Sequence, residues 1–150
     1  MKVFIEKIEA EQEEQVRIAC HKVTPRIREI EKFVYSGEQQ LEGMREGRLY
    51  TMVLSDICYV ESVDDHLFAY TGKEVFELKC RLYEFEEAYG DRKFFRCAKA
   101  AIVNLMKIRS LRPALNGRFA AMLENGEEII ISRKYVGALR ERLRGGNEDA

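Results

Sequence analysis

Two basic segments, far apart in the chain, carry the residue types best suited to binding a polyanion. The first is FFRCAKAAIVNL, residues 94–105, which places Arg96 and Lys99 in front of an apolar run. The second is SRKY, residues 132–135, in which two cations are adjacent. A guanidinium can pair bidentately with a phosphate or with guanine O6 and N7, and an ammonium can bind the same groups as a point charge. We therefore expect the two segments to lie on one face and to bind nucleic acid.

The distribution of charge along the chain favours the same interpretation. Residues 1–90 contain 12 Lys and Arg against 19 Asp and Glu, a balance of −7, whereas residues 91–150 contain 13 against 7, a balance of +6. The formal net charge of −1 therefore conceals an acidic front and a basic back. A basic half favours a polyanionic partner, because neutralised phosphates supply most non-specific nucleic-acid affinity. An uneven but merely solvated distribution of charge would explain the composition equally well.

The length of 150 residues suits one domain, or one domain with a small extension. With 46% hydrophobic and 34% charged residues, the composition is typical of a soluble globular protein. No apolar run approaches the roughly 18 residues of a membrane span. The N-terminus MKVFIEKIEAEQEEQ is too charged for a signal peptide, so we expect a cytoplasmic location.

The cysteines show no C-x-x-C spacing, which argues against a zinc site and against a disulfide framework. There are four of them, and we expect reduced, mostly buried thiols: Cys20, Cys58, Cys80 and Cys97. One of the four supports a further hypothesis, since Arg96 and Lys99 could lower the pKa of the Cys97 thiol and make it a redox sensor. Burial in an apolar strand would have the opposite effect on that pKa.

No arrangement of residues that could catalyse a reaction is present. The sequence contains no phosphate-cradling glycine loop, no G-x-S-x-G and no H-E-x-x-H, and it has only two histidines. Adjacent carboxylates such as Glu86 and Glu87 face different ways on a helix, which is typical of a solvated surface. We therefore expect a protein that is not an enzyme and that binds neither a cofactor nor a metal ion.

The elements that must position the basic residues begin with a distinct N-terminal piece, residues 1–37. Alternating apolar side chains predict strands over residues 2–8 and 16–20. Thr24-Pro25 is a helix-start signal, and the apolar spacing that follows predicts a helix that Gly37 can end. This strand–strand–helix extension is either a compact unit or a loosely attached appendage. We expect it to serve in dimerisation or in docking a partner.

From residue 39 onward, short alternating segments with turn signals between them predict β-structure. The predicted strands cover residues 39–45, 48–54, 56–63, 66–71 and 74–78. One helix interrupts them, with apolar residues at helical spacing in RLYEFEEAYG and an end at Gly90. The fold class is therefore mainly β, α+β overall, in the form of a sandwich or a barrel.

The basic last third continues the pattern. Strands are predicted over residues 105–111, 118–124 and 127–131, separated by the two turn signals Asn116-Gly117 and Asn125-Gly126. A helix over residues 134–143 follows, with Ser132 as its N-cap. Residues 145–150 are expected to be a frayed, disordered tail.

Three motifs, in this order, carry a resemblance to a known family. They are DICYVES at residues 56–62, FFRCAKAAIVNLMKI at residues 94–108, and the NG…ISRKY run at residues 125–135 with its closing helix. Residues 45–144 resemble a LytTR-type DNA-binding domain, as in stand-alone bacterial regulators without a receiver domain. The resemblance implies an elongated, multi-stranded β-sandwich with short helices, whose loops enter successive major grooves of double-stranded DNA.

Matched residue by residue, the resemblance implies base contacts from three loop positions: His66, Lys99 and Arg133. Nearby cations are expected to contact phosphates: Arg96, Lys134, Arg109 and Arg118. Arg109 and Arg118, together with Arg112, could instead lie on the opposite strand face, and Lys134 could simply be solvated. The chain departs from the family pattern at Ala100, where many members have Ser, and at Ala98, where His is frequent. Two further donors to DNA are therefore absent. We expect Phe94 and Phe95 to pack in the core, and Asn104 to bind backbone groups rather than a base.

The function that follows is that of a sequence-specific DNA-binding transcriptional regulator. Two copies on DNA are expected, because bacterial operators are commonly repeated half-sites about one helical turn apart. The resemblance also implies a possible small membrane protein as a restraining partner. The alternative is a β-rich interaction or adaptor module whose basic face binds an acidic protein.

Overall fold

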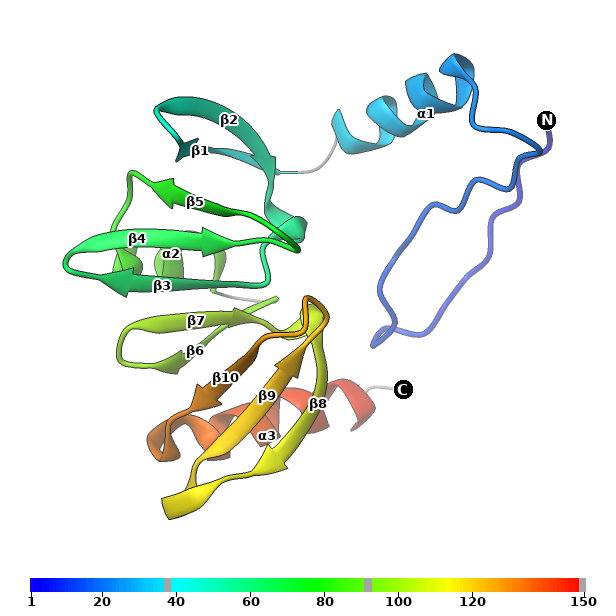
Figure 1. The fold of residues 1–150 in the computed structure, drawn as a ribbon. Coiled ribbons are helices and arrows are strands. Elements are labelled where there is room, and N and C mark those ends of the chain that lie inside the picture. Colours follow the sequence, from blue (N-terminus) through cyan, green and yellow to red (C-terminus); the bar gives the residue numbers. More distant parts are fainter. Residues whose placement is uncertain (37–38, 91–92, 149–150) are drawn as a thin grey trace. The chain divides into compact units, whose positions relative to one another are not determined.

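The protein is described by a computed structural model that covers residues 1–36, 39–90 and 93–148. These residues contain ten β-strands and three α-helices, and all of the strand pairs are antiparallel. The chain divides into two units, residues 38–139 and a second unit of residues 1–37 with 140–150. The predicted fold class, mainly β and α+β overall, is confirmed (Figure 1).

A seven-stranded sheet forms the larger part of residues 38–139, with the strand order β2-β1-β5-β4-β3-β7-β6. One helix, α2, is inserted before its last hairpin. The elements are β1 (Gln40–Arg45), β2 (Arg48–Val53), β3 (Tyr59–Val63), β4 (His66–Tyr70), β5 (Val75–Leu78), α2 (Leu82–Tyr89), β6 (Phe94–Ala98) and β7 (Ala101–Asn104). Each strand predicted between residues 39 and 78 is present, and so is the helix, whose end at Gly90 is marked by its N–H donating to the Glu86 carbonyl at 2.8 Å.

A second sheet of three strands, in the order β10-β9-β8, follows the first. Its strands are β8 (Ile108–Pro113), β9 (Phe119–Leu123) and β10 (Glu128–Ile131), and α3 (Arg133–Glu148) comes directly after them. The Asn-Gly signals mark turns as predicted, since Gly117 and Gly126 both have positive φ. The predicted helix end at Leu143 is wrong, because α3 continues to Glu148, and so the tail predicted from residue 145 begins too early. Residues 149–150 lie outside the described residues.

Segment 94–104, which the sequence singled out, is a hairpin buried on both faces. Phe94 and Ile102 belong to a core with α2, and Phe95 and Val103 belong to a core with the second sheet and the start of α3. Successive strand residues point to opposite faces, so a hairpin covered on both sides carries apolar residues on both faces, with Arg96 as the charged exception in β6. The prediction that both phenylalanines pack in the core is confirmed.

Asn104 ends β7 and is 1% exposed, the only buried polar residue among those the structure describes. Its Nδ2 donates to the Ile57 carbonyl at 2.9 Å, and its Oδ1 accepts from the Met106 N–H at 3.0 Å. The side chain therefore satisfies two backbone groups where the chain leaves the first sheet for the second. The prediction that Asn104 is structural is therefore confirmed. Its hydrogen bonds hold the connection between the two sheets in one conformation.

The N-terminal unit differs from its prediction. Helix α1 (Pro25–Ser36) is present, with the Ile27 N–H donating to Thr24 Oγ1 at 3.4 Å, but residues 2–8 and 16–20 form no strands. The strand prediction was wrong because alternation stabilises a strand only where there is a partner to pair with and a face to bury. Val3 and Ile5 are 85% and 97% exposed, so neither condition holds. Gly37 lies outside the described residues, so the predicted helix end there stays a prediction.

Candidate nucleic-acid interface

Three turns meet at one end of residues 38–139. They are the β3–β4 turn, the β6–β7 turn and the β10–α3 junction, which lie along the left side of this unit in Figure 1. The Ser62 N–H donates to the Ala100 carbonyl at 2.8 Å, which joins the first turn to the second. The Ser132 N–H donates to the Cys97 carbonyl at 2.8 Å, which joins the second to the third. The structure therefore brings together the three turns that carry the predicted base-contacting residues.

His66 follows a turn that holds its own shape. Asp64 and Asp65 have φ of 51° and 66°, and positive φ at both central residues of a two-residue hairpin defines a type I′ turn, whose twist matches that of the strands. His66 is exposed, and its Nδ1 lies 2.9 Å from Glu77 Oε2. A carboxylate held at Nδ1 orients the ring and leaves Nε2 for another partner.

Lys99 occupies the first position of the β6–β7 turn, and its side chain is exposed. The backbone beneath it is held more tightly than that of an ordinary hairpin, because each carbonyl from residue 97 to residue 100 accepts a hydrogen bond. Two of these bonds come from the Ser62 and Ser132 amides. The other two come from one side chain, that of Arg96. The turn thus offers an exposed ammonium from a fixed backbone.

Arg133 is the first residue of α3 and is exposed. Its aliphatic stem lies over Gly117 in the β8–β9 turn, where a Cβ added to Gly117 would be 2.8 Å from Arg133 Cδ and 3.0 Å from Cγ. A cation at a helix N-terminus is disfavoured by the helix dipole, so an anion bound nearby would stabilise this arrangement. The glycine provides the space in which the arginine lies.

The cations predicted to contact phosphates are placed differently from one another. Lys134 and Arg118 are exposed and lie at the Arg133 end of the second sheet, because Phe119 pairs with Ile131 there. Arg109 is exposed at the opposite end of β8, next to the Ile108–Leu123 pair. Arg96 is turned inward, with its side chain only 22% exposed and paired with Glu86. The structure therefore brings Lys134 and Arg118 beside the three turns, but not Arg109.

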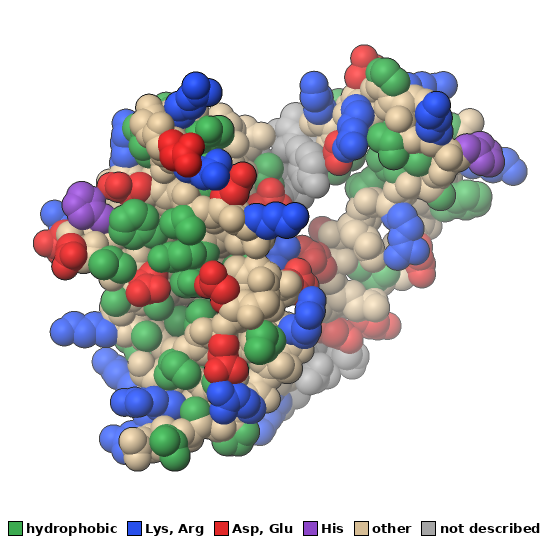
Figure 2. Space-filling model, in the orientation of Figure 1, with side chains coloured by type: hydrophobic (Ala, Val, Ile, Leu, Met, Phe, Trp, Pro, Cys, Tyr) green, Lys and Arg blue, Asp and Glu red, His purple; other side chains and the backbone are tan. Residues whose placement is uncertain are grey.

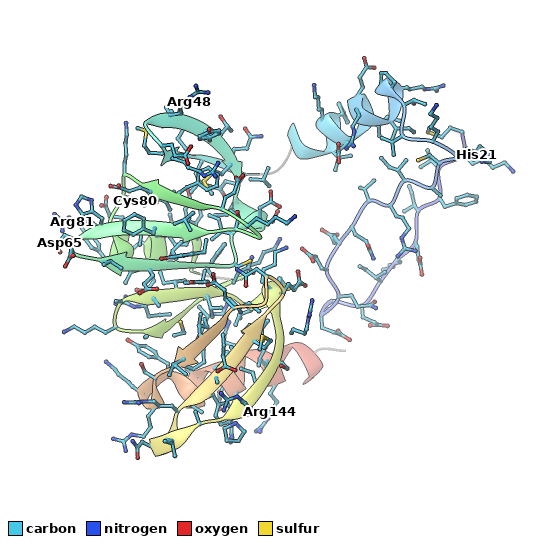
Figure 3. All side chains as sticks on the ribbon, viewed as in Figure 1. His21, Arg48, Asp65, Cys80, Arg81 and Arg144 are labelled. Atoms are coloured by element: carbon cyan, nitrogen blue, oxygen red, sulfur yellow. The ribbon has the colours of Figure 1, made fainter. Side chains whose placement is uncertain are left out.

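Charge is divided across this end of the unit. Figure 2 shows Asp and Glu side chains beside the histidine near the β3–β4 turn, and Lys and Arg side chains next to the β6–β7 hairpin and below it. One of the acidic groups, Asp65, lies 3.9 Å from Arg81 Nη1, and Figure 3 shows the two side by side. Electrostatic attraction of a polyanion therefore falls mainly on the Lys99 and Arg133 turns.

The hypothesis of a reactive Cys97 does not fit its surroundings. The thiol is 0% exposed, and burial raises its pKa to about 12, an effect that outweighs the opposing influence of Arg96. Since the thiolate is the reactive form, this cysteine is inert near neutral pH. Cys58 is also buried, Cys80 is half-buried and Cys20 is exposed.

Sequence reasoning missed two contacts that shape the site. Glu86 was interpreted as a solvated carboxylate, and its side chain is 40% exposed, but that interpretation did not include the hydrogen bond that its Oε1 accepts from Arg96 Nη1 at 2.8 Å. The Asn116-Gly117 signal predicted a turn but not that Arg133 lies on it. Both contacts join residues from different elements, and no local pattern marks them.

No helix among the described residues is long and apolar enough to cross a membrane.

Comparison with known proteins gives matches to one family and to proteins named as transcriptional regulators. Residues 47–144 match the family described as the LytTr DNA-binding domain. The transcriptional regulatory protein YpdB of Escherichia coli (strain K12) is 29% identical over 101 residues, which are 67% of this chain and 41% of YpdB. An uncharacterized HTH-type transcriptional regulator of Staphylococcus aureus (strain NCTC 8325) is 30% identical over 103 residues, 69% of each chain. The chain thus spans less than half of the length of the Escherichia coli relative.

Among solved structures, a LytTr DNA-binding domain from Bacillus cereus has the same fold. It matches with a TM-score of 0.65 at 24% identity, covering 73% of this chain and 99% of that chain.

Proposed function

The chain belongs to the LytTr DNA-binding domain family, and from that premise we propose that it is a sequence-specific transcriptional regulator that contacts major-groove base edges through its three adjacent turns. The observation that carries the proposal is the pair of backbone hydrogen bonds, Ser62 to Ala100 and Ser132 to Cys97, that join these turns. They keep three exposed donor side chains in fixed register. Base recognition requires such a register, because each base pair presents its acceptors at set positions in the groove.

The proposed roles follow from the chemistry of each side chain. Arg133 donates its fork to guanine O6 and N7, and Lys99 donates to a guanine acceptor. His66 contacts a base edge through Nε2, with its ring oriented by Glu77. Lys134 and Arg118, at the Arg133 end of the second sheet, contact phosphates. Arg109 would reach a phosphate only on DNA that continues along the second sheet.

The wider setting is proposed on the same basis. The matched relatives are named as transcriptional regulators, and we infer that this chain acts in the cytoplasm, as a homodimer on two half-sites, without catalysis or a cofactor. The N-terminal unit, residues 1–37, is the proposed dimer contact or docking surface. A small membrane protein is its proposed partner by family resemblance alone.

Fluorescence anisotropy with duplex DNA tests the proposal. Fragments selected from genomic DNA supply a preferred site, and a scrambled duplex of the same length is the reference. Binding should weaken steeply as salt rises, and Arg133→Ala should cost about 1–3 kcal/mol on the preferred site but little on the scrambled duplex. Equal losses on both would make Arg133 a phosphate contact.

Arg112→Ala is the matched control for Arg133→Ala. Arg112 is likewise an exposed arginine, but it lies on β8 rather than at the start of α3, and its Nη2 is 2.7 Å from Glu128 Oε1. Its loss should leave the preference for the selected site unchanged. Absence of binding to any duplex at low salt would refute the DNA-binding proposal and favour the adaptor module, whose basic face would bind an acidic protein.

A further inference from the structure

The guanidinium of Arg96 is occupied by the protein itself. Its Nε donates to the Ala98 carbonyl at 2.8 Å, its Nη2 donates to the Lys99 carbonyl, and its Nη1 donates to Glu86 Oε1 at 2.8 Å. Two of the three guanidinium nitrogens thus donate to backbone carbonyls at the β6–β7 turn, and the third donates to a carboxylate of α2. A planar, rigid set of donors can hold several acceptors in one geometry, which a lysine cannot do.

The β6–β7 turn needs such support. It is a two-residue hairpin, because Ala98 pairs with Ala101, and neither Lys99 nor Ala100 is among the residues with positive φ. Two-residue hairpins favour types I′ and II′, since turns with negative φ splay the strands. The pairing of β6 with β7 is also shifted between Arg96 and Ala98, as at a β-bulge. The turn that carries Lys99 is therefore intrinsically less well determined than the β3–β4 turn.

Glu86 fixes the other end of the fork. It lies on α2 next to Phe85, which is 0% exposed in the core between α2 and the first sheet. Packing of Phe85 fixes the helix that carries Glu86, while the Glu86 side chain itself is 40% exposed. Since this pair is partly open to solvent, its main contribution is to orient the guanidinium through a charge-assisted hydrogen bond of 2.8 Å.

From this geometry we propose that Arg96 is a positioning residue: anchored by Glu86, it holds the β6–β7 turn so that Lys99 is presented to base edges, and it sets specificity without contacting DNA. The inference rests on the proposed function and replaces the expectation that Arg96 contacts a phosphate. The two roles predict different effects of substitutions at Arg96 and Glu86 on DNA binding. For a phosphate contact only the positive charge matters, whereas for a positioning residue the fork and its carboxylate matter.

Two substitutions separate the roles. Arg96→Lys keeps the charge and loses the fork, so a phosphate contact would survive it and a positioning role would not. Glu86→Gln removes a negative charge from the site, so a phosphate contact would become stronger on every duplex. The positioning role instead predicts weaker binding to the preferred site. Glu87→Gln is the matched control, since Glu87 is an exposed carboxylate on the same helix.

The experiment measures binding of the full chain to preferred and scrambled duplexes over a salt series. Arg96→Lys and Glu86→Gln should lower the preference for the selected site roughly tenfold, approaching the effect of Lys99→Ala, with the salt slope unchanged. Combining Arg96→Lys with Lys99→Ala should add little to Lys99→Ala alone, because both remove one contact. A wild-type preference in Arg96→Lys, or tighter binding to scrambled DNA in Glu86→Gln, would overturn the inference.

A second measurement needs no DNA. Amide hydrogen exchange at Ala100 and Ala101 should be faster in Arg96→Lys and Glu86→Gln than in the wild type, and unchanged in Glu87→Gln. Unchanged exchange in both variants would show that Arg96 does not hold the turn. If the wild type bound no duplex, the proposed function would fail, and these exchange rates would still decide whether Arg96 holds the turn.

Discussion

Gly117 and Gly126 offer a test of how Arg133 is positioned, because the same substitution should have different consequences at the two sites. Both glycines follow an asparagine in a turn of the second sheet, and their φ values are +75° and +89°. A Cβ at Gly117 would lie 2.8 Å from Arg133 Cδ, whereas a Cβ at Gly126 would meet nothing within 4 Å. The two alanine variants therefore share the backbone strain and differ in the contact with Arg133.

The magnitudes follow from these distances. An alanine with positive φ costs about 1–2 kcal/mol, and the reduced entropy of the unfolded chain returns about 0.4–1 kcal/mol, so each variant should lose about 1 kcal/mol of unfolding free energy. Ordinary contact begins at 3.4 Å, so Arg133 Cδ must move by at least about 0.6 Å in Gly117→Ala. The flexible side chain can move at little energetic cost, but the proposed bidentate contact with guanine would lose its alignment.

Urea unfolding and anisotropy together check this prediction. Both variants should unfold at similarly reduced urea concentrations. Only Gly117→Ala should lose affinity for the preferred site. The loss should not exceed that of Arg133→Ala, which is about 1–3 kcal/mol, and binding to scrambled DNA should change little. Equal binding by the two variants would refute the view that Gly117 sets the position of the Arg133 side chain.

Two further predictions concern buried groups. Asn104→Ala should lower the free energy of unfolding in urea by about 2–4 kcal/mol, because it leaves the Ile57 carbonyl and the Met106 N–H without their partner, and a loss well below 1 kcal/mol would contradict this. Cys97 should be alkylated far more slowly than the exposed Cys20 in the folded protein at pH 8. The reason is that burial raises the pKa of the Cys97 thiol to about 12. Comparable alkylation rates of the two cysteines would contradict this prediction.

Features that depend on neighbouring residues could be predicted from the sequence. The Thr24-Pro25 start of α1 and the two Asn-Gly turns were found because capping and positive φ are local requirements. The core role of Phe94 and Phe95 was also predicted, since aromatic residues entering a β-core usually pack in it. The three candidate base-contacting residues came from the family resemblance. The structure adds that their turns are joined by hydrogen bonds.

Features that depend on a partner far along the chain could not be predicted. Alternation over residues 2–8 is the same signal that predicted β4 and β5, and it failed only because no strand pairs with that segment. The Arg96–Glu86 pair joins a strand to a helix ten residues earlier, and Arg133 lies over a glycine sixteen residues before it. Residue type alone cannot distinguish such an arginine from one that is free to bind phosphate.

The three turns differ in what holds them, and this has a consequence for how specificity is determined. The β3–β4 turn is fixed by its own backbone, since Asp64 and Asp65 adopt the I′ conformation. The Lys99 turn depends on the Arg96 fork, and the Arg133 side chain depends on the space over Gly117. In the proposed function, recognition at the second and third positions therefore depends partly on residues that need not touch DNA. Substitutions at those supporting residues should change site preference while leaving the salt dependence of binding intact, which distinguishes them from substitutions of phosphate contacts.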